Sequence, residues 1–128
     1  MNLKVFDLEK INLVFREDKI VEIRVKDYNV ITIDDAKEQY ELIEEHMPNQ
    51  KVCMLIVPGI HTTISTNIIS FVNSKKCIQK SKAEAVVLNN LANRITYNFL
   101  SKFSSRKMKG FDCEEKALEW LKQEQVFV

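Results

Sequence analysis

The sequence predicts a single α/β domain, in which a mixed sheet of about five strands opens with a β-hairpin and is packed with about four helices. Three observations predict this class: two strand-like runs joined by a short polar turn near the N-terminus, an alternation of strand-like and helix-like segments after them, and two continuous apolar runs. A length of 128 residues fits one domain, and a hydrophobic content of 45% is enough to build a core.

The hairpin comes first. Residues 11–18 and 19–27 are rich in Val, Ile and Phe, and the polar residues between the two runs predict a tight connection. Residues 20–25 alternate in a period of two, which predicts a strand with one buried face. Residues 29–33 form a further short extended piece.

A helix is predicted next, beginning at Thr32 and ending at Pro48. Thr32 and Asp35 have the spacing of a capping box, and proline ends a helix at the residue before it. The residues on its apolar face are Ala36, Tyr40, Ile43 and Met47.

The rest of the chain alternates strand and helix. Residues 51–57 and 83–89 are the two continuous apolar runs, and such runs suit parallel strands that are buried on both faces. No regular element is predicted for the polar residues 73–82. In chain order, the other predicted elements are a helix within 64–72, a helix over 90–103 with Ala92, Ile95, Phe99 and Phe103 on one face, a short edge strand at 106–111, and a helix over 112–123 with Asp112 as N-cap.

Composition excludes several classes of function. No apolar stretch approaches the ~20 residues of a membrane span, and the charged N-terminus lacks the apolar core of a signal peptide. The cysteines Cys53, Cys77 and Cys113 form no CxxC pair, so a reducing cytoplasm is the expected setting. Neither the cysteines nor the two histidines have a zinc-binding spacing, and we expect no metal and no cofactor.

Charge is distributed unevenly along the chain. Residues 1–50 hold 7 Lys and Arg against 12 Asp and Glu, whereas residues 51–128 hold 12 against 6. Between residues 75 and 109 the only acid is Glu84. Two interpretations stay open: a solvated surface whose basic side chains meet the acidic first half, or an anion-binding face. The candidate anion-binding residues are Lys75, Lys76, Lys80, Lys82, Arg106 and Lys107.

The stretch "PGIHTTISTNII", residues 58–69, places several hydroxyl side chains between a proline-glycine turn and a helix. Ser65 or Thr66 can serve there as an N-cap or as a phosphoacceptor, since a helix N-terminus favours both a capping oxygen and a phosphate. His61 and Thr63 lie in the same loop, and the four residues together are the candidate interaction surface.

Three stretches carry a family resemblance: "DKIVEIRVKDYNVITIDDAKE", "LIVPGIHTTIST" and "AVVLNNLANRITYNFLSKFSSRKMKGFDCEEKALEWL". The last is similar to SpoIIAA-like proteins, relatives of the STAS domain of anti-sigma-factor antagonists. The resemblance covers roughly residues 10–123 and implies a single SpoIIAA/STAS-like domain over residues 1–128. In the antagonists, a serine in an Asp-Ser-Ser/Thr-Gly pattern is phosphorylated. The matching positions here are Ile64, Ser65, Thr66 and Asn67, so the hydroxyls are kept while the acid and the glycine are replaced.

The resemblance implies a non-catalytic STAS-like module that acts through protein contacts, and no acid, base or nucleophile set in the sequence predicts an enzyme. The alternative is a carrier or sensor of a hydrophobic molecule or an anionic lipid, because some SpoIIAA-like proteins resemble lipid-carrier domains in outline. Phe99, Phe103 and Trp120 are the candidate pocket residues for that alternative. The expected partner is another protein, with a homodimer and a lipid as open alternatives. No nucleic-acid-binding motif is visible, so nucleic acid is not expected.

Overall fold

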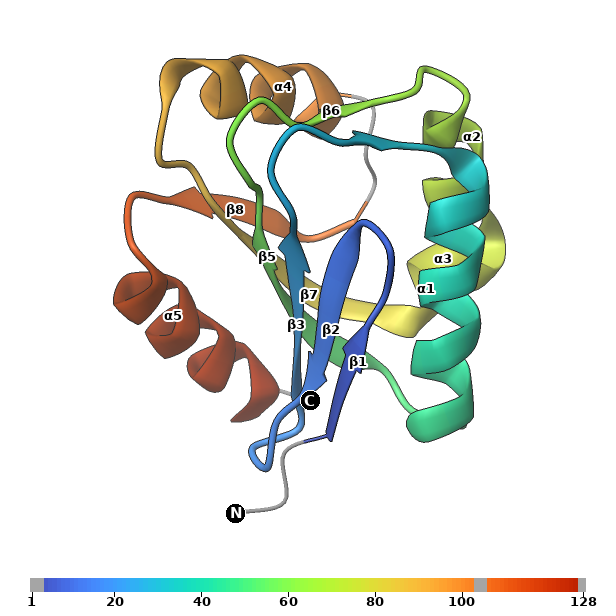
Figure 1. Ribbon diagram of the computed structural model, residues 1–128. Coiled ribbons are helices and arrows are strands. Elements are labelled where there is room, and N and C mark those ends of the chain that lie inside the picture. Colours follow the sequence, from blue (N-terminus) through green and yellow to red (C-terminus); the bar gives the residue numbers. More distant parts are fainter. Residues whose placement is uncertain (1–3, 103–105, 127–128) are drawn as a thin grey trace.

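The computed structural model describes residues 4–102 and 106–126, except for the side chains of residues 99 and 100. A six-stranded sheet forms its centre, in the order β1-β2-β3-β5-β7-β8 (Figure 1). Its strands are β1 (Lys4–Asp7), β2 (Ile11–Phe15), β3 (Ile20–Val25), β5 (Val52–Val57), β7 (Ser81–Val87) and β8 (Met108–Phe111). β1, β2 and β3 are antiparallel neighbours, and β3, β5, β7 and β8 run parallel, which confirms the predicted mixed sheet with an opening hairpin.

Two further strands form a small parallel sheet at one end of the molecule. They are β4 (Val30–Ile31) and β6 (Thr63–Ile64). β1, β6 and a short helix from residue 75 to residue 80 are the elements that the sequence did not predict. Each is short, and a segment of two to six residues is too brief for a periodic apolar pattern to be recognised.

Five helices in the described part of the chain pack around the sheet (Figure 1). They are α1 (Ile33–His46), α2 (Ile68–Val72), α3 (Lys75–Lys80), α4 (Leu91–Ser101) and α5 (Glu114–Val126). α5 covers one face of the sheet, whereas α1, α2 and α3 cover the other, and α4 lies near β6 at one end. Two apolar clusters result, one on each side of the sheet.

The central strand β3 departs from its predicted single buried face. Its first four residues are all buried, because α5 covers the face of Ile20 while α1 and α2 cover the face of Val21 and Ile23. Glu22 is only 7% exposed and is neutralised by Arg16 and Arg24 at 2.6 and 2.7 Å. A charged residue at a period-two position therefore does not mark a solvent face here, since two half-buried arginines neutralise it.

The predicted capping box at the start of α1 is confirmed. Thr32 Oγ1 accepts a hydrogen bond from the Asp35 N–H, and Asp35 Oδ2 accepts one from the Thr32 N–H at 2.8 Å. Lys10 adds an ion pair to the same Asp35 oxygen at 2.8 Å. α1 is thus fixed to the hairpin at its first turn.

The predicted inner face of α4 is wrong at Ala92 and Ile95, whereas Phe103 and the side chain of Phe99 lie outside the described residues. Ala92 and Ile95 point to solvent, and Ile95 is 61% exposed. Asn93 is buried instead: its N–H bonds the Asn90 side chain at 2.8 Å, and its amide bonds Asn89 at 2.7 Å. These amide contacts orient the described part of the helix so that Asn93 faces the interior.

The last helix begins two residues later than predicted. α5 starts at Glu114, so Asp112 is not its N-cap and instead pairs with Lys116 at 3.3 Å. Ala117 and Leu121 are fully buried against the sheet.

Candidate functional site

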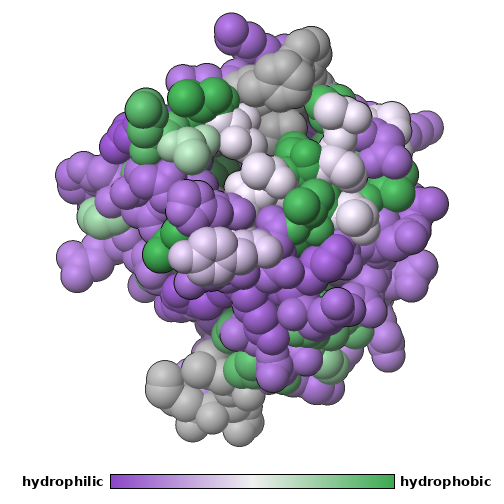
Figure 2. Space-filling model, turned by 45° about the horizontal axis from the view of Figure 1, so that its top comes forward, coloured by the Kyte–Doolittle hydropathy of each residue, from purple (hydrophilic) through white to green (hydrophobic). Residues whose placement is uncertain are grey.

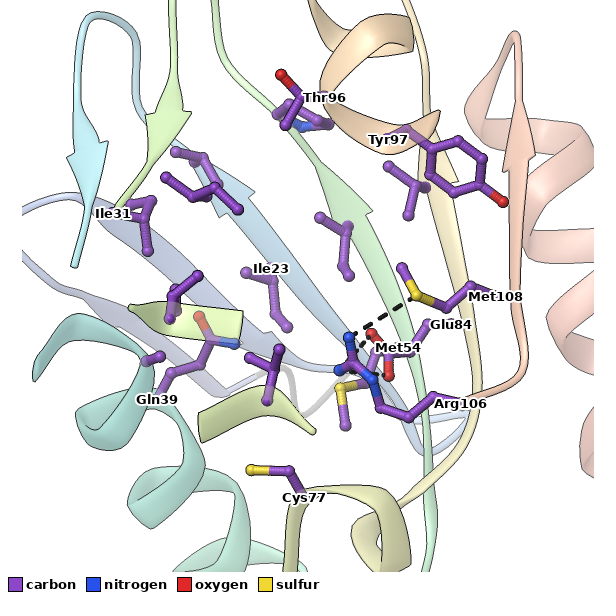
Figure 3. A pocket seen from close by; sticks show the side chains of 18 of the residues that line it. Ile23, Ile31, Gln39, Met54, Cys77, Glu84, Thr96, Tyr97, Arg106 and Met108 are labelled. Atoms are coloured by element: carbon purple, nitrogen blue, oxygen red, sulfur yellow. Dashed lines mark hydrogen bonds and ion pairs between the residues drawn. The ribbon is translucent and has the colours of Figure 1, made fainter. Parts of the chain in front are cut away.

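A cavity of about 220 Å³ lies between the sheet and the helices on the side of α1. Ile23, Met54 and Val86 of the sheet form its floor, and residues of α1, α2 and α4 surround it (Figure 3). The other apolar lining residues include Ile31, Ala36, Ile43, Ile56, Ile64, Ile68, Phe71 and Met108. Protein interiors are normally packed with few voids larger than a water, and an apolar cavity of about 150 Å³ is already large enough for benzene. This cavity is therefore large enough for a small organic molecule.

The rotation of α4 and the shortness of α2 explain why this space is not filled. α4 turns Thr96 and Tyr97 toward the cavity and keeps Ile95 outside. α2 is five residues long and contributes two buried side chains, Ile68 and Phe71. Among the described side chains, the apolar residues Leu91 and Ile95 of α4 therefore do not fill this space.

One end of the cavity lies beneath β6 and α4. Thr63 is exposed and Thr62 and Thr96 are half-buried, whereas Cys77 lies at the opposite end in Figure 3. Figure 2 looks toward this end of the molecule, where apolar and near-neutral atoms gather around a hollow. The exposed large apolar residues include Leu91 and Ile95 of α4 and, near β4 and β6, Tyr28, Val30 and Ile60.

A buried ion pair lies in the wall of the cavity. Glu84 of β7 is 2% exposed, and its Oε2 lies 2.9 Å from the Arg106 guanidinium and 2.9 Å from the Ser81 hydroxyl that donates to it. Arg106 also donates to Oε1 at 3.2 Å and contacts the sulfur of Met108 at 3.7 Å (Figure 3). Burial raises the pKa of Glu84, and Arg106 and Ser81 offset only part of that effect. A buried ion pair contributes little net stability, because the cost of removing its charges from water offsets their attraction. Its position in the wall of a cavity therefore indicates a binding site.

Lys80 also lines the cavity, and it is held by α1. Its Nζ donates to the Met47 carbonyl and lies 2.8 Å from Glu44. The hydrogen bond from Lys80 lowers the pKa of Glu44. Lys80 is 5% exposed, and the contact fixes the end of α3 to the end of α1.

The six predicted anion-binding residues lie on both sides of the sheet. Lys76 lies over the Tyr40 ring at 5.0 Å and, with Lys80, belongs to the α1 side. Lys82 donates to the Gln125 carbonyl at 2.8 Å, and Lys107 pairs with Glu124, both on α5. Lys75 is exposed, and Arg106 pairs with Glu84 as described. Much of the basic segment is thus engaged in separate contacts.

The proline-glycine turn before the hydroxyl residues makes a close contact with the end of β3. A Cβ atom on Gly59 would lie 2.5 Å from the Val25 carbonyl, so only glycine fits there without a shift. The Ile60 N–H bonds Asp27 Oδ1 at 2.8 Å, and the Ile60 carbonyl accepts from the Tyr28 N–H at 2.8 Å. The turn is therefore joined to the loop that follows β3.

The hydroxyl residues are placed differently from the predicted helix cap. α2 begins at Ile68, so Asn67 is the residue before it, and the Ser65 hydroxyl donates to Asn67 Oδ1 at 2.8 Å. Thr66 is exposed. His61 is exposed, has a left-handed backbone (φ 52°), and stacks on Tyr28 with ring centroids 5.4 Å apart. His61, Thr63 and Thr66 are accessible, and Ser65 is half-buried.

Of the three predicted aromatic pocket residues, Trp120 lies away from the cavity. Trp120 packs on Phe111 with ring centroids 5.5 Å apart, on the α5 side of the sheet. Phe103 and the side chain of Phe99 lie outside the described residues. The cavity is lined by residues of at least seven elements, which no local pattern could group. Of the lining residues, Glu84 is the one that the sequence marks as unusual, because it is a lone acid within both an apolar run and a basic segment.

Among residues 4–102 and 106–126, no three His, Cys, Asp or Glu side chains lie close enough together to hold a metal ion. The same part of the chain contains no helix with the length and apolar character to cross a membrane. The three cysteines are free, Cys53 buried and Cys77 and Cys113 half-buried.

Comparison with solved structures places the architecture in the SpoIIAA-like class. The chain is similar to an uncharacterized protein of the DUF3478 family with a SpoIIAA-like fold from Shewanella loihica PV-4, with a TM-score of 0.56 over 94% of this chain and 92% of the other. The two are 13% identical, so the likeness concerns the fold alone. A family model matches residues 14–125, and the chain belongs to that family, a domain of unknown function (DUF7793). The comparison with curated proteins found no match.

Proposed function

We propose that this protein is a non-catalytic carrier or sensor that binds a hydrophobic small molecule in the cavity between the sheet and α1, α2 and α4. The observation that carries the proposal is the cavity itself, which is about 220 Å³, mostly apolar, and equipped with a few convergent polar groups. A concave apolar pocket of this kind is the usual form of a small-molecule site. Because the three cysteines are free, we place the protein in a reducing cytoplasm.

A fluorescent apolar amine, N-phenyl-1-naphthylamine, tests the proposal. We expect saturable binding with enhanced emission by the wild-type protein. Thr96→Trp fills the cavity from α4, and we expect it to weaken binding at least tenfold. Ile95→Trp is the matched control, since the adjacent side chain is 61% exposed and should leave binding unchanged. Equal affinity in all three proteins, or no saturable binding, would contradict the proposal.

Cysteine reactivity provides a second readout that needs no variant. Cys77 lines the cavity, whereas Cys113 lies just before α5. Saturating amounts of the probe should slow the reaction of Cys77 with N-ethylmaleimide and leave that of Cys113 unchanged, as followed by peptide mass spectrometry. Equal protection of both thiols would indicate a general effect and not occupancy of the cavity.

A second candidate function is protein recognition through residues 61–66. The favouring observation is the exposed group beside that turn, in which Tyr28 is 73% exposed and stacks on His61, next to Ile60 at 50%. The partner is another protein or a second copy of this chain. Analytical ultracentrifugation of Tyr28→Ser and Ile60→Ser against wild type tests the second copy, and Leu91→Ser on α4 is the control. Co-purification of a partner with wild type, lost in Thr66→Asp but kept in Leu91→Ser, is the expected result for a heterologous partner.

A further inference from the structure

We infer that the cavity takes an apolar monocarboxylic acid, whose carboxyl group binds beside the Glu84–Arg106 pair and shares one proton with Glu84. The inference deepens the proposed function and rests on it. It names the chemical class of the ligand and adds a proton to the binding reaction.

The geometry of the pair carries the inference. Glu84 and Arg106 place carboxylate oxygens and guanidinium N–H groups side by side in the wall of the cavity, with Arg106 Nη1 2.9 Å from Glu84 Oε2. A protonated carboxyl group has a donor and an acceptor side by side, so it matches this arrangement. Its apolar chain would extend past Ile23 toward Ile31, which lies at the side of the cavity away from Arg106 (Figure 3), and toward Ile64, the register partner of Ile31.

The charges explain why a proton accompanies the ligand. Glu84 already balances the charge of Arg106 in the empty site, and a second carboxylate would leave one buried negative charge in excess. Two carboxyl groups in hydrogen-bond contact cannot both be ionised at low cost, so they hold one proton between them. The proton comes from solvent, and no covalent bond is made or broken other than that O–H bond. The direction of the Glu84 pKa, raised by burial, favours this uptake.

A Cys77→Ser background removes the one thiol of the lining from the titration at pH 8.5, and the other groups around Glu84 then leave the carboxyl pair as the site of titration. Arg106 is the charged side chain against it, and Ser81 of the same strand donates to it without a charge. Lys80 is neutralised by Glu44 on α1. The remaining titratable lining residues are Tyr40 of α1, Cys77 of α3 and Tyr97 of α4, and burial raises the pKa of both tyrosines further above neutrality.

Isothermal titration calorimetry with octanoic acid tests the inference, with octan-1-ol as the matched neutral ligand. Titrations at pH 8.5 in two buffers of different ionisation enthalpy measure protons bound. We expect uptake approaching one proton per octanoate and none for octanol. The Kd for octanoate should rise by up to tenfold per pH unit above the pKa of Glu84. Zero uptake for octanoate at pH 8.5 would overturn the inference.

Glu84→Gln separates a binding role from a structural one. The inference predicts tighter binding of octanoate, whereas loss of a structural residue would weaken it. With the charge of Arg106 no longer balanced by Glu84, octanoate should bind as the anion, at least tenfold more tightly than to wild type at pH 8.5 and without proton uptake. Weaker binding of octanoate by a folded Glu84→Gln protein would also overturn the inference.

If Glu84→Gln does not fold, Glu84→Gln/Arg106→Met removes both charges together. The double variant should keep octanol and the naphthylamine probe and lose octanoate at least tenfold. Equal octanoate binding by the double variant and wild type would overturn the inference. If neither octanol nor the probe binds wild type, the proposed function itself fails. If wild type binds octanol and the probe but its octanoate binding does not depend on Glu84, only the assignment of a carboxylic acid fails.

Discussion

Arg24 joins the central strand to the last helix: its Nη2 lies 2.5 Å from Glu114 Oε1, in the first turn of α5. The same guanidinium donates through Nε to Glu22 at 2.7 Å, and Glu22 also accepts from Arg16 at 2.6 Å. Glu22 is the most buried member of this network. It depends most on its partners, because an unpaired buried carboxylate is costly.

Arg24→Ala tests how much this network contributes to stability. It leaves Glu22 with Arg16 as its remaining cation, and we expect a loss of about 1–3 kcal/mol in the free energy of unfolding. Lys116→Ala is the control, since its ion pair with Asp112 is exposed on both sides and should contribute little. Urea denaturation measures both. Equal midpoints for the two variants would show that burial of Glu22 does not set the cost.

Stability should fall in acid below about pH 4.5, the ordinary pKa of a glutamate. The hydrogen bond from Arg24 lowers the pKa of Glu114; for Asp35, burial acts upward but the bonds from Lys10 and Thr32 prevail and lower its pKa. A carboxyl group with a folded pKa below its unfolded value stabilises the fold above the unfolded pKa, and the contribution is lost as pH falls through the folded one.

Urea midpoints at pH 7, 4 and 3 measure this effect. Asp35→Asn should be less stable than wild type at pH 7, and its midpoint should change less between pH 4 and pH 3. An unchanged pH dependence in Asp35→Asn would exclude that carboxyl as a source of the acid sensitivity.

Much of the fold was predictable because its signals are local. The capping box at Thr32 and Asp35 fixed the start of α1, and the two apolar runs marked β5 and β7. The facing of α4 was not predictable from its apolar residues. Amide contacts among Asn89, Asn90 and Asn93 decide its rotation, and these depend on where β7 ends.

The cavity was not predictable from the sequence. A void arises from what several elements fail to fill, and neither the short α2 nor the rotated α4 shows this in its own residues. The sequence interpretation placed aromatic bulk at the site, whereas Trp120 packs on the opposite face of the sheet. Glu84 stands out in the sequence as a lone acid, but its pairing with Arg106, 22 residues later, depends on the three-dimensional fold.

Thr32→Ala should cost about 1 kcal/mol of stability, since it removes the side chain that caps α1. Thr66→Ala is the matched change at the other helix where the sequence suggested a hydroxyl cap. Thr66 is exposed and α2 begins after Asn67, so we expect a change within the error of urea denaturation. A loss at residue 66 as large as that at residue 32 would mean that the hydroxyl turn has a structural role that its hydrogen bonds do not reveal.

Gly59 lies in the turn that precedes the hydroxyl residues, and Gly110 of β8 is its matched control. In both, an added Cβ would lie 2.5 Å from its nearest neighbour. At Gly59 that neighbour is the Val25 backbone carbonyl, with the Asp27 backbone nitrogen at 2.9 Å, and Val25 cannot move without breaking its pairing with Ile11 of β2. At Gly110 it is the terminal Cδ1 of Leu88, which can change rotamer.

Gly59→Ala should therefore cost about 2–3 kcal/mol, toward the upper end of the range for overpacking, and Gly110→Ala about 1 kcal/mol or less. Differential scanning calorimetry compares the two. Because the turn from Gly59 leads to Thr62 and Thr63 at the cavity, Gly59→Ala should also weaken binding of the naphthylamine probe, whereas Gly110→Ala should weaken it less. Equal losses in both variants would mean that the loop yields as easily as a leucine side chain, and the rigid attachment of the turn to β3 would be refuted.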